Sequence, residues 1–287
     1  MTVCVAAFAE KSKALVMVSD KALTHSSVYG ADTDIQKMLH VGKSNWRALV
    51  AGDPSFAKKV IRDAASEIQK DKTINETQFA MMNCVSRSYQ KSREESVVDQ
   101  ILTPRLLTKE LLTKELLVGR RSELLPLPGS YSDDVLRELR AFQAQCDLLL
   151  CGFDSGGTPH IFSVVEPGVS IDHDMSGYHA IGSGAAFAIA KLLSWDVNRN
   201  RPLAEVLYRA FDAKAHAEIV STVGFAWDGY VLTRRRGWRV KLSVRKALDD
   251  LFVQVNRSPF DTSPKSRTRK KLQTRVLKFA ATVMKRK

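Results

Sequence analysis

Short apolar, β-rich runs occur in pairs along this chain. "TVCVAAF" and "ALVMVSD" are joined by the polar "AEKSK", and "DLLLCGFD" and "PHIFSVV" are joined by "SGGT". A third pair, "KMLHV" and "RALVAG", lies around the turn "GKSN". Two such runs with a short polar or glycine-rich connection are typical of a β-hairpin. Repeated hairpins therefore predict antiparallel sheets.

Helical patterns separate these groups of strands. Apolar residues recur at helical spacing from Phe56 to Ile68, and a second helix is expected over Thr77 to Lys91. After the central hairpin, "AAFAIAKLLSW" and "LAEVLYRAFDAKAHA" indicate two more helices, and "VGFAWDGYVL" indicates a final strand. Antiparallel strands with paired helices on either side predict a layered sandwich of the α+β class.

Residues 92–145 interrupt this order and are expected to form a helical insertion. "LLTKE" occurs there twice in tandem, and "LLPLPGS" follows. Leucines at this density with Lys and Glu between them favour an amphipathic helix that breaks near the prolines. The leucine-rich face has to pack, either on the body of the protein or on a neighbouring subunit.

The net charge of +13 is unevenly distributed. Residues 234–287 hold 18 Lys and Arg against 3 acidic residues, which leaves 26 basic and 28 acidic residues in 1–233. We therefore interpret 1–232 as one near-neutral domain and 233–287 as a basic C-terminal extension. Within the extension, "LSVRKALDDLFVQV" is apolar enough to pack as a final helix. The last residues predict a basic amphipathic helix that docks on the body, an acidic partner, an anionic membrane or nucleic acid.

Several protein classes are disfavoured. No run of 18 apolar residues predicts a membrane span, and the N-terminal residues lack the pattern of a secretory signal. We therefore expect a cytoplasmic protein in which all four cysteines are reduced. The cysteines and the six histidines follow no metal-ligand spacing, so neither a metal nor a cofactor is expected.

Five strings together resemble a known family: "MTVCVAA…LVMVSD", "DIQKMLHVG", "ALVAGD", "LLLCGFDSGGTPHIFSV" and "AIGSGAAFA". Their order and separations are similar to those of the proteasome β-subunit group of N-terminal nucleophile (Ntn) hydrolases, nearest the bacterial HslV- and Anbu-type proteins. The similarity extends from Thr2 to about Leu232 and is interrupted by the insertion. It implies a four-layer αββα sandwich of two antiparallel sheets flanked by helices. It also implies a threonine-type peptidase or amidase.

The resemblance implies that Met1 is removed and that Thr2 becomes the nucleophile of an acyl transfer. Asp20 matches the acid that closes the second strand, Lys37 the lysine ahead of the third strand, and Gly52 the oxyanion donor. A threonine hydroxyl needs a base. The freed α-amine of Thr2, with an unperturbed pKa of about 7.7–8.0, can accept its proton. Lys37 would lower the pKa of the hydroxyl, and Asp20 would hold Lys37 in place.

The remaining part of the family pattern departs from expectation at one position. Ser183 in "IGSGA" matches the serine beside the nucleophile's amine. Glu218 and Ser221 have the family's spacing, but Glu replaces Asp, and Thr222 is an alternative to Ser221. This departure favours a second hypothesis, a weak or inactive scaffold subunit on the same fold. A third is a basic-tailed adaptor that binds nucleic acid or another polyanion.

The family also implies partners. Its members act on peptide or protein substrates inside homo-oligomeric rings or helical assemblies, and some work with an ATPase. We therefore expect a homo-oligomer for this chain.

Overall fold

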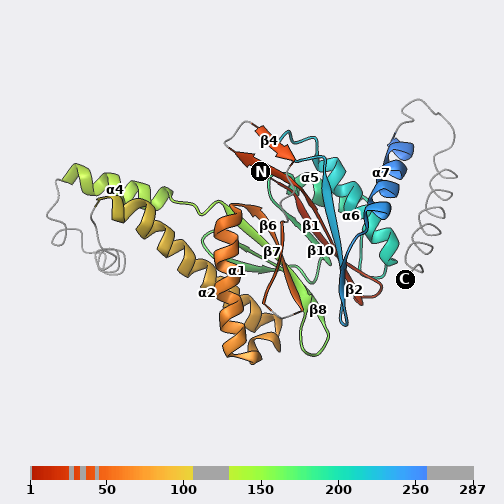
Figure 1. Cartoon of the computed structure of the whole chain (residues 1–287), viewed down its shortest axis with the longest axis horizontal. Coiled ribbons are helices and arrows are strands. Elements are labelled where there is room, and N and C mark those ends of the chain that lie inside the picture. Colours follow the sequence, from red (N-terminus) through yellow and green to blue (C-terminus); the bar gives the residue numbers. More distant parts are fainter. Residues whose placement is uncertain (1, 26–28, 33–36, 43–44, 106–128, 257–287) are drawn as a thin grey trace.

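The computed structural model describes residues 2–25, 29–32, 37–42, 45–105 and 129–256. It contains two five-stranded antiparallel sheets with helices packed against them, which confirms the predicted α+β class (Figure 1). Among the described residues, none of the helices combines the length and apolar character needed to span a membrane.

The first sheet has the strand order β10–β1–β2–β11–β12. Its strands are Cys4–Ala9 (β1), Ala14–Asp20 (β2), Tyr178–Ile181 (β10), Trp227–Thr233 (β11) and Gly237–Arg239 (β12). The predicted hairpin of β1 and β2 pairs Cys4 with Ser19 and Ala9 with Ala14. This register brings the start of β1 next to the end of β2.

The second sheet has the order β5–β6–β7–β8–β9. Its strands are Met38–His40 (β5), Trp46–Gly52 (β6), Cys146–Phe153 (β7), Pro159–Val165 (β8) and Val169–Asp172 (β9). A separate two-stranded ribbon follows β2 and consists of Ala22–His25 (β3) and Tyr29–Asp32 (β4). The other two predicted hairpins, β5–β6 and β7–β8, are both present.

The helices cover the outer faces of the two sheets (Figure 1). One pair, α1 (Pro54–Lys70) and α2 (Gln78–Val97), packs on the second sheet. The other pair, α5 (Ala185–Ser194) and α6 (Leu203–Ala217), packs on the first sheet. Cys4, Ala6 and Phe8 face the second sheet, and the alternate residues of β1 face α5 and α6. Because both faces of β1 are buried, its sequence is apolar throughout rather than alternating.

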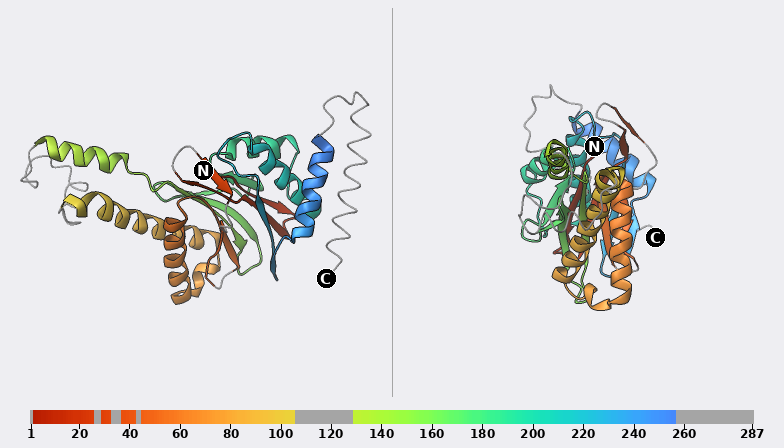
Figure 2. Two further views of the ribbon diagram at one scale, coloured as in Figure 1. Left: turned by 45° about the horizontal axis from the view of Figure 1, so that its top comes forward. Right: turned by 90° about the vertical axis from the view of Figure 1, so that its left-hand side faces the viewer.

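The insertion forms an arm of two helices that extends away from the sheets (Figures 1 and 2). The prediction ended α2 at Lys91, but the helix continues to Val97, and its last turns still bury Ser92 and Val97. The chain goes on through η2 (Val98–Leu102) and η3 (Thr103–Arg105) and returns in α4 (Gly129–Ala141), which packs on η2. The tandem "LLTKE" repeat lies outside the described residues.

The C-terminal boundary of the domain differs from the predicted one at 232. Helix α7 (Leu242–Asn256) packs beside α6 and buries Leu248 (Figure 2). Trp227 Nε1 donates a hydrogen bond to Asp249 Oδ1 at 2.9 Å, and Arg245 Nη1 donates to the carbonyl of Trp227 at 2.8 Å. The packed body therefore continues to Asn256, and residues 257–287 lie outside the described residues.

Candidate functional site

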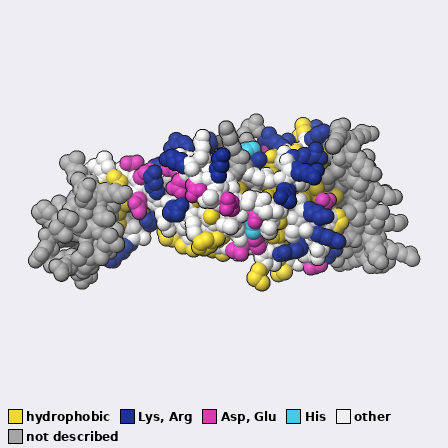
Figure 3. All heavy atoms as spheres, turned by 90° about the horizontal axis from the view of Figure 1, so that it is seen from below, with side chains coloured by type: hydrophobic (Ala, Val, Ile, Leu, Met, Phe, Trp, Pro, Cys, Tyr) yellow, Lys and Arg dark blue, Asp and Glu magenta, His cyan; other side chains and the backbone are white. Residues whose placement is uncertain are grey.

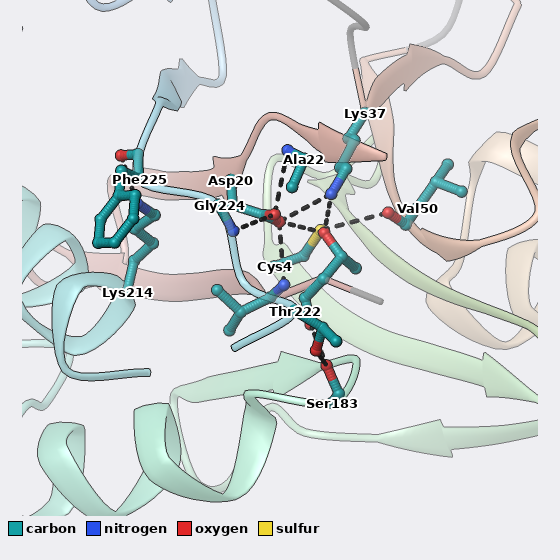
Figure 4. A network of polar contacts seen from close by, with 12 residues as sticks. Cys4, Asp20, Ala22, Lys37, Val50, Ser183, Lys214, Thr222, Gly224 and Phe225 are labelled. Carbon is teal, nitrogen blue, oxygen red and sulfur yellow. Dashed lines mark hydrogen bonds and ion pairs between the residues drawn. The ribbon is translucent and has the colours of Figure 1, made fainter. Parts of the chain in front are cut away.

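Three of the predicted site residues meet at one end of the stacked sheets (Figure 4). Thr2 precedes β1, Asp20 ends β2, and Lys37 precedes β5 in the other sheet. Thr2 Oγ1 donates to Asp20 Oδ1, and Lys37 Nζ donates to Thr2 Oγ1. Lys37 Nζ also forms an ion pair with Asp20 Oδ1 at 2.8 Å. All three residues are buried, with 2%, 0% and 8% of their surface exposed for Thr2, Asp20 and Lys37.

The Asp20 carboxylate is held by backbone donors on both oxygens. Oδ1 accepts from the N–H of Val3 at 3.0 Å, and Oδ2 accepts from Ala22 at 3.2 Å and Gly224 at 3.1 Å. Several N–H donors and one ammonium compensate the loss of hydration that a buried carboxylate suffers. Asp20 therefore has a fixed orientation in which one oxygen faces both Thr2 and Lys37.

Cys4 lies near Lys37 and is a neutral thiol because it is buried. The carbonyl of Lys37 accepts from the N–H of Val50, which aligns the start of β5 with β6. Cys4 Sγ donates to the carbonyl of Val50 at 3.4 Å. Burial raises the pKa of the Cys4 thiol to about 12, although the nearby Lys37 ammonium opposes this change. Cys4 is therefore a neutral thiol and does not compete with Thr2 as a nucleophile.

The turn that contains Ser183 holds the backbone of Thr2. The N–H of Gly184 and the hydroxyl of Ser183 donate to the carbonyl of Thr2 at 3.3 and 3.4 Å. Gly182 has φ +92°, and a Cβ atom there would lie 2.3 Å from the same carbonyl. Glycine is therefore required at 182, because any side chain would push Thr2 out of the site.

Gly52 lies at the end of β6, two residues beyond Val50. It has φ +104°, and a Cβ atom at this position would lie 1.8 Å from the carbonyl oxygen of Gln145. The backbone alone thus requires glycine at 52. Because the backbone geometry already explains glycine at this position, the role of Gly52 as an oxyanion donor stays a prediction.

The structure shows what Glu218 contacts and how far Ser221 is exposed. Glu218 Oε1 accepts from Lys214 Nζ at 2.6 Å. The hydroxyl that meets Ser183 Oγ, at 3.2 Å, belongs to Thr222, while Ser221 is exposed. Thr222, the alternative considered above, is thus the hydroxyl that contacts Ser183. The predicted effect of Glu218 and Ser221 on the amine of Thr2 stays a prediction.

Lys214 is a site residue that the sequence analysis missed. It is fully buried on α6, and its ammonium donates to Glu218 and, at 2.7 Å, to the carbonyl of Phe225 (Figure 4). The segment between these two contacts includes Thr222 and Gly224, which reach Ser183 and Asp20. Lys214 therefore anchors this segment against α6. Its i, i+4 spacing to Glu218 was the available signal.

The arrangement has the elements of an activated hydroxyl. A buried threonine oxygen contacts one cation and one carboxylate, and its main chain is fixed by a glycine-rich turn. The described residues contain no group of three or more His, Cys, Asp or Glu that could hold a metal ion. No protein-family model matches the chain, and no curated protein was found to match it.

Proposed function

We propose that the chain is an Ntn hydrolase of the proteasome β-subunit-like type, which cleaves peptide or amide bonds by acyl transfer to Thr2. One observation carries this proposal. Thr2 Oγ1 contacts both Lys37 Nζ and Asp20 Oδ1 in a buried site. A nucleophile beside a cation and a fixed carboxylate is the arrangement that covalent catalysis by a hydroxyl needs.

The mechanism requires that Met1 is removed, because the α-amine of Thr2 then acts as the base. The amine takes the hydroxyl proton, directly or through a water molecule, and Oγ1 attacks the carbonyl carbon of the scissile amide. Lys37 stabilises the negative charge that develops on Oγ1, and the N–H of Gly52 donates to the oxyanion. The amine returns the proton to the leaving nitrogen, and water then hydrolyses the ester on Thr2.

The first test compares Thr2→Ala with Thr2→Ser and with Thr158→Ala, an exposed threonine on the β7–β8 turn. We expect the intact mass of the wild-type protein to show loss of Met1. Thr2→Ala should lower the hydrolysis of fluorogenic peptide amides by a factor on the order of 10³ or more, because the nucleophile is gone. Thr2→Ser should keep measurable turnover, and Thr158→Ala should match wild type. Quantitative retention of Met1, or full activity of Thr2→Ala, would contradict the proposal.

A scaffold subunit on the same fold is the second candidate. The pairing of Glu218 with the buried Lys214 favours it, because this carboxylate is then engaged away from Thr2. A protein that loses Met1 but neither hydrolyses peptides nor reacts with a threonine-directed epoxyketone would support the scaffold.

The remaining predictions belong to the same proposal. They are a homo-oligomeric ring or helical assembly, an ATPase partner and a cytoplasmic location. The basic-tailed adaptor depends on residues 257–287, which lie outside the described residues.

A further inference from the structure

Six exposed basic side chains belong to three segments at the end of the first sheet that lies opposite Thr2, and Figure 3 shows several groups of Lys and Arg on one face of the molecule. We call this set the basic edge. It combines the β1–β2 turn, the loop between α5 and α6, and the β11–β12 turn. Its members are Lys11, Lys13, Arg199, Arg234, Arg235 and Arg236.

Backbone contacts hold these three segments together. The N–H of Lys11 donates to the carbonyl of Arg199 at 2.6 Å. Strands β2 and β11 pair Ala14 with Thr233, so the turn that follows Thr233 lies beside the β1–β2 turn. That turn is closed by the N–H of Thr233, which donates to the carbonyl of Arg236 at 2.8 Å. The basic edge is therefore a fixed feature of the folded body.

The β1–β2 turn has an unusual backbone for its sequence. Glu10, Lys11 and Ser12 have φ values of +53°, +57° and +64°. The left-handed region is unfavourable for a non-glycine residue because of its Cβ atom, and glycine would avoid most of this strain. Strain of this kind concentrates at functional sites. Non-glycine residues occupy this turn although glycine would fit its backbone better. We infer that the side chain of Lys11 has a role beyond closing the turn.

The charges of the basic edge are not neutralised by the described carboxylates. None of the ion pairs between described residues includes a member of the edge. In the β1–β2 turn, the loop between α5 and α6 and the β11–β12 turn, the acidic residues are Glu10 and Asp196, and Asp196 pairs with Arg201 at 2.6 Å. On the neighbouring turn and loop of the second sheet, Asp154 and Asp174 both contact His160. The edge thus presents positive charge to the solvent.

The basic edge includes residues that the sequence analysis assigned to the C-terminal extension. Residues 234–256 carry seven Lys and Arg against two acidic residues, and they belong to the packed body. Three of those seven form the β11–β12 turn of the basic edge. Part of the basic excess that the sequence assigned to a C-terminal extension is therefore displayed by the body itself.

The planar guanidinium groups of the basic edge match the geometry of phosphate, as they match that of a carboxylate. Arg199 Cζ lies 5.6 Å from the ring centre of Phe8, and Arg236 Cζ lies 5.3 Å from that of Trp238. Arg199 Nη2 also donates to the carbonyl of Asp174 at 2.6 Å, which fixes this side chain. An arginine held over an aromatic ring can direct its remaining N–H donors at a phosphate. Contacts to phosphate position a protein on nucleic acid and carry no sequence information.

We propose that the basic edge binds the phosphate backbone of nucleic acid without sequence preference. This inference is independent of the proposed hydrolase activity, since the basic edge and Thr2 lie at opposite ends of β1. Such binding releases counterions and therefore weakens steeply with salt.

The test measures binding of a fluorescein-labelled 20-nucleotide single-stranded DNA to the full chain by anisotropy, from 50 to 300 mM salt. One variant combines Arg234→Glu, Arg235→Glu and Arg236→Glu. The matched control combines Lys58→Glu, Arg62→Glu and Lys70→Glu, three exposed residues of α1 with the same total charge change. Circular dichroism and thermal unfolding check that both variants are folded.

We expect the edge variant to lose at least about tenfold in affinity at 50 mM salt. Its slope of log affinity against log salt should fall by about 2, since each lost phosphate contact on single strands removes about 0.7. The α1 control should lose less than about threefold. Equal losses in both variants, or an unchanged edge variant, would overturn the proposal, because binding would then follow net charge or lie elsewhere. Equally tight binding of poly-glutamate would also overturn it and would indicate an acidic protein partner.

Discussion

Charged side chains lie at both ends of the β1–β2 hairpin, but they are buried at one end and exposed at the other. At one end, Asp20 and Lys37 are buried, pair at 2.8 Å and contact Thr2. At the other end, Lys11 and Lys13 are exposed and pair with none of the described carboxylates. Thr2 and Asp20 lie within eleven residues of Lys11 and Lys13 in the sequence, although their environments differ.

The comparison shows that access to solvent determines whether a charged side chain affects stability or recognition in this fold. A buried ion pair resists the removal of either partner, because the remaining charge has no water to hydrate it. An exposed cation contributes little to stability and acts through the field that it presents to a partner. The Thr2 end is thus suited to chemistry, and the turn end is suited to recognition.

The largest expected effect is that of Lys37→Met. It leaves the buried Asp20 carboxylate without its cation, which should lower the free energy of unfolding by about 3–5 kcal/mol. The matched control at the other end of the hairpin, Lys13→Met, should change it by less than about 0.5 kcal/mol. Urea unfolding at pH 7 measures both values. Equal decreases in the free energy of unfolding for Lys37→Met and Lys13→Met would contradict the difference between the buried and the exposed end of the hairpin.

A smaller loss is expected from Lys214→Met, which removes both contacts that anchor the segment before β11. We expect a decrease of about 2–4 kcal/mol, because Glu218 and the Phe225 carbonyl lose a buried donor. Lys246→Met on α7, at an exposed position, is the control. Adding Glu218→Gln to Lys214→Met should recover part of the loss. A double variant as unstable as the sum of both single variants would contradict the proposed pairing.

The third prediction concerns the loss of stability at acid pH that His173 causes. Burial, and then the His179 ring stacked at 3.5 Å, lower the pKa of His173 to about 4. The unfolded chain binds this proton near pH 6.5, so His173 costs stability as the pH falls from about 6.5 toward 4. His173→Gln should therefore lose about 1–3 kcal/mol less than wild type between pH 7 and pH 4.5. The exposed His216→Gln is the control, and an unchanged acid sensitivity of His173→Gln would refute the assignment.

The smallest expected effect belongs to the strained turn. Lys11→Gly removes the cost of a left-handed backbone and should stabilise the protein by up to about 1 kcal/mol, while it weakens DNA binding. Lys13 is not in the left-handed region, so Lys13→Gly should bring no such gain. Thermal unfolding and the anisotropy titration together measure both effects. A loss of stability in Lys11→Gly would show that the side chain is kept for packing.

Much of the fold could be predicted because its signals are local. The apolar runs with polar connections indicated the hairpins β1–β2, β5–β6 and β7–β8, and the helical spacing after Pro54 indicated α1. These elements depend on side-chain periodicity and turn residues, which neighbours in the sequence supply. The end of α2 was placed too early because its last turns are stabilised by packing rather than by their own composition.

The candidate site was predictable in part. Thr2, Asp20 and Lys37 were chosen from a resemblance, and the structure brings them together. Thr222, rather than Ser221, meets Ser183, because the segment after α6 turns its two hydroxyls to different sides. Periodicity does not specify which of two adjacent hydroxyls faces the site.

By itself, the sequence determined the three hairpins, the helices α1, α5 and α6, the α+β class and the uneven distribution of charge, since each follows from residues close together in the chain. The tertiary structure alone decided where α7 docks on the body and that Lys214 anchors the segment beside Asp20. It also decided that Lys11, Arg199 and Arg234 share one edge. These features join residues far apart in sequence, and their burial or exposure exists only once the two sheets and their helices have excluded water.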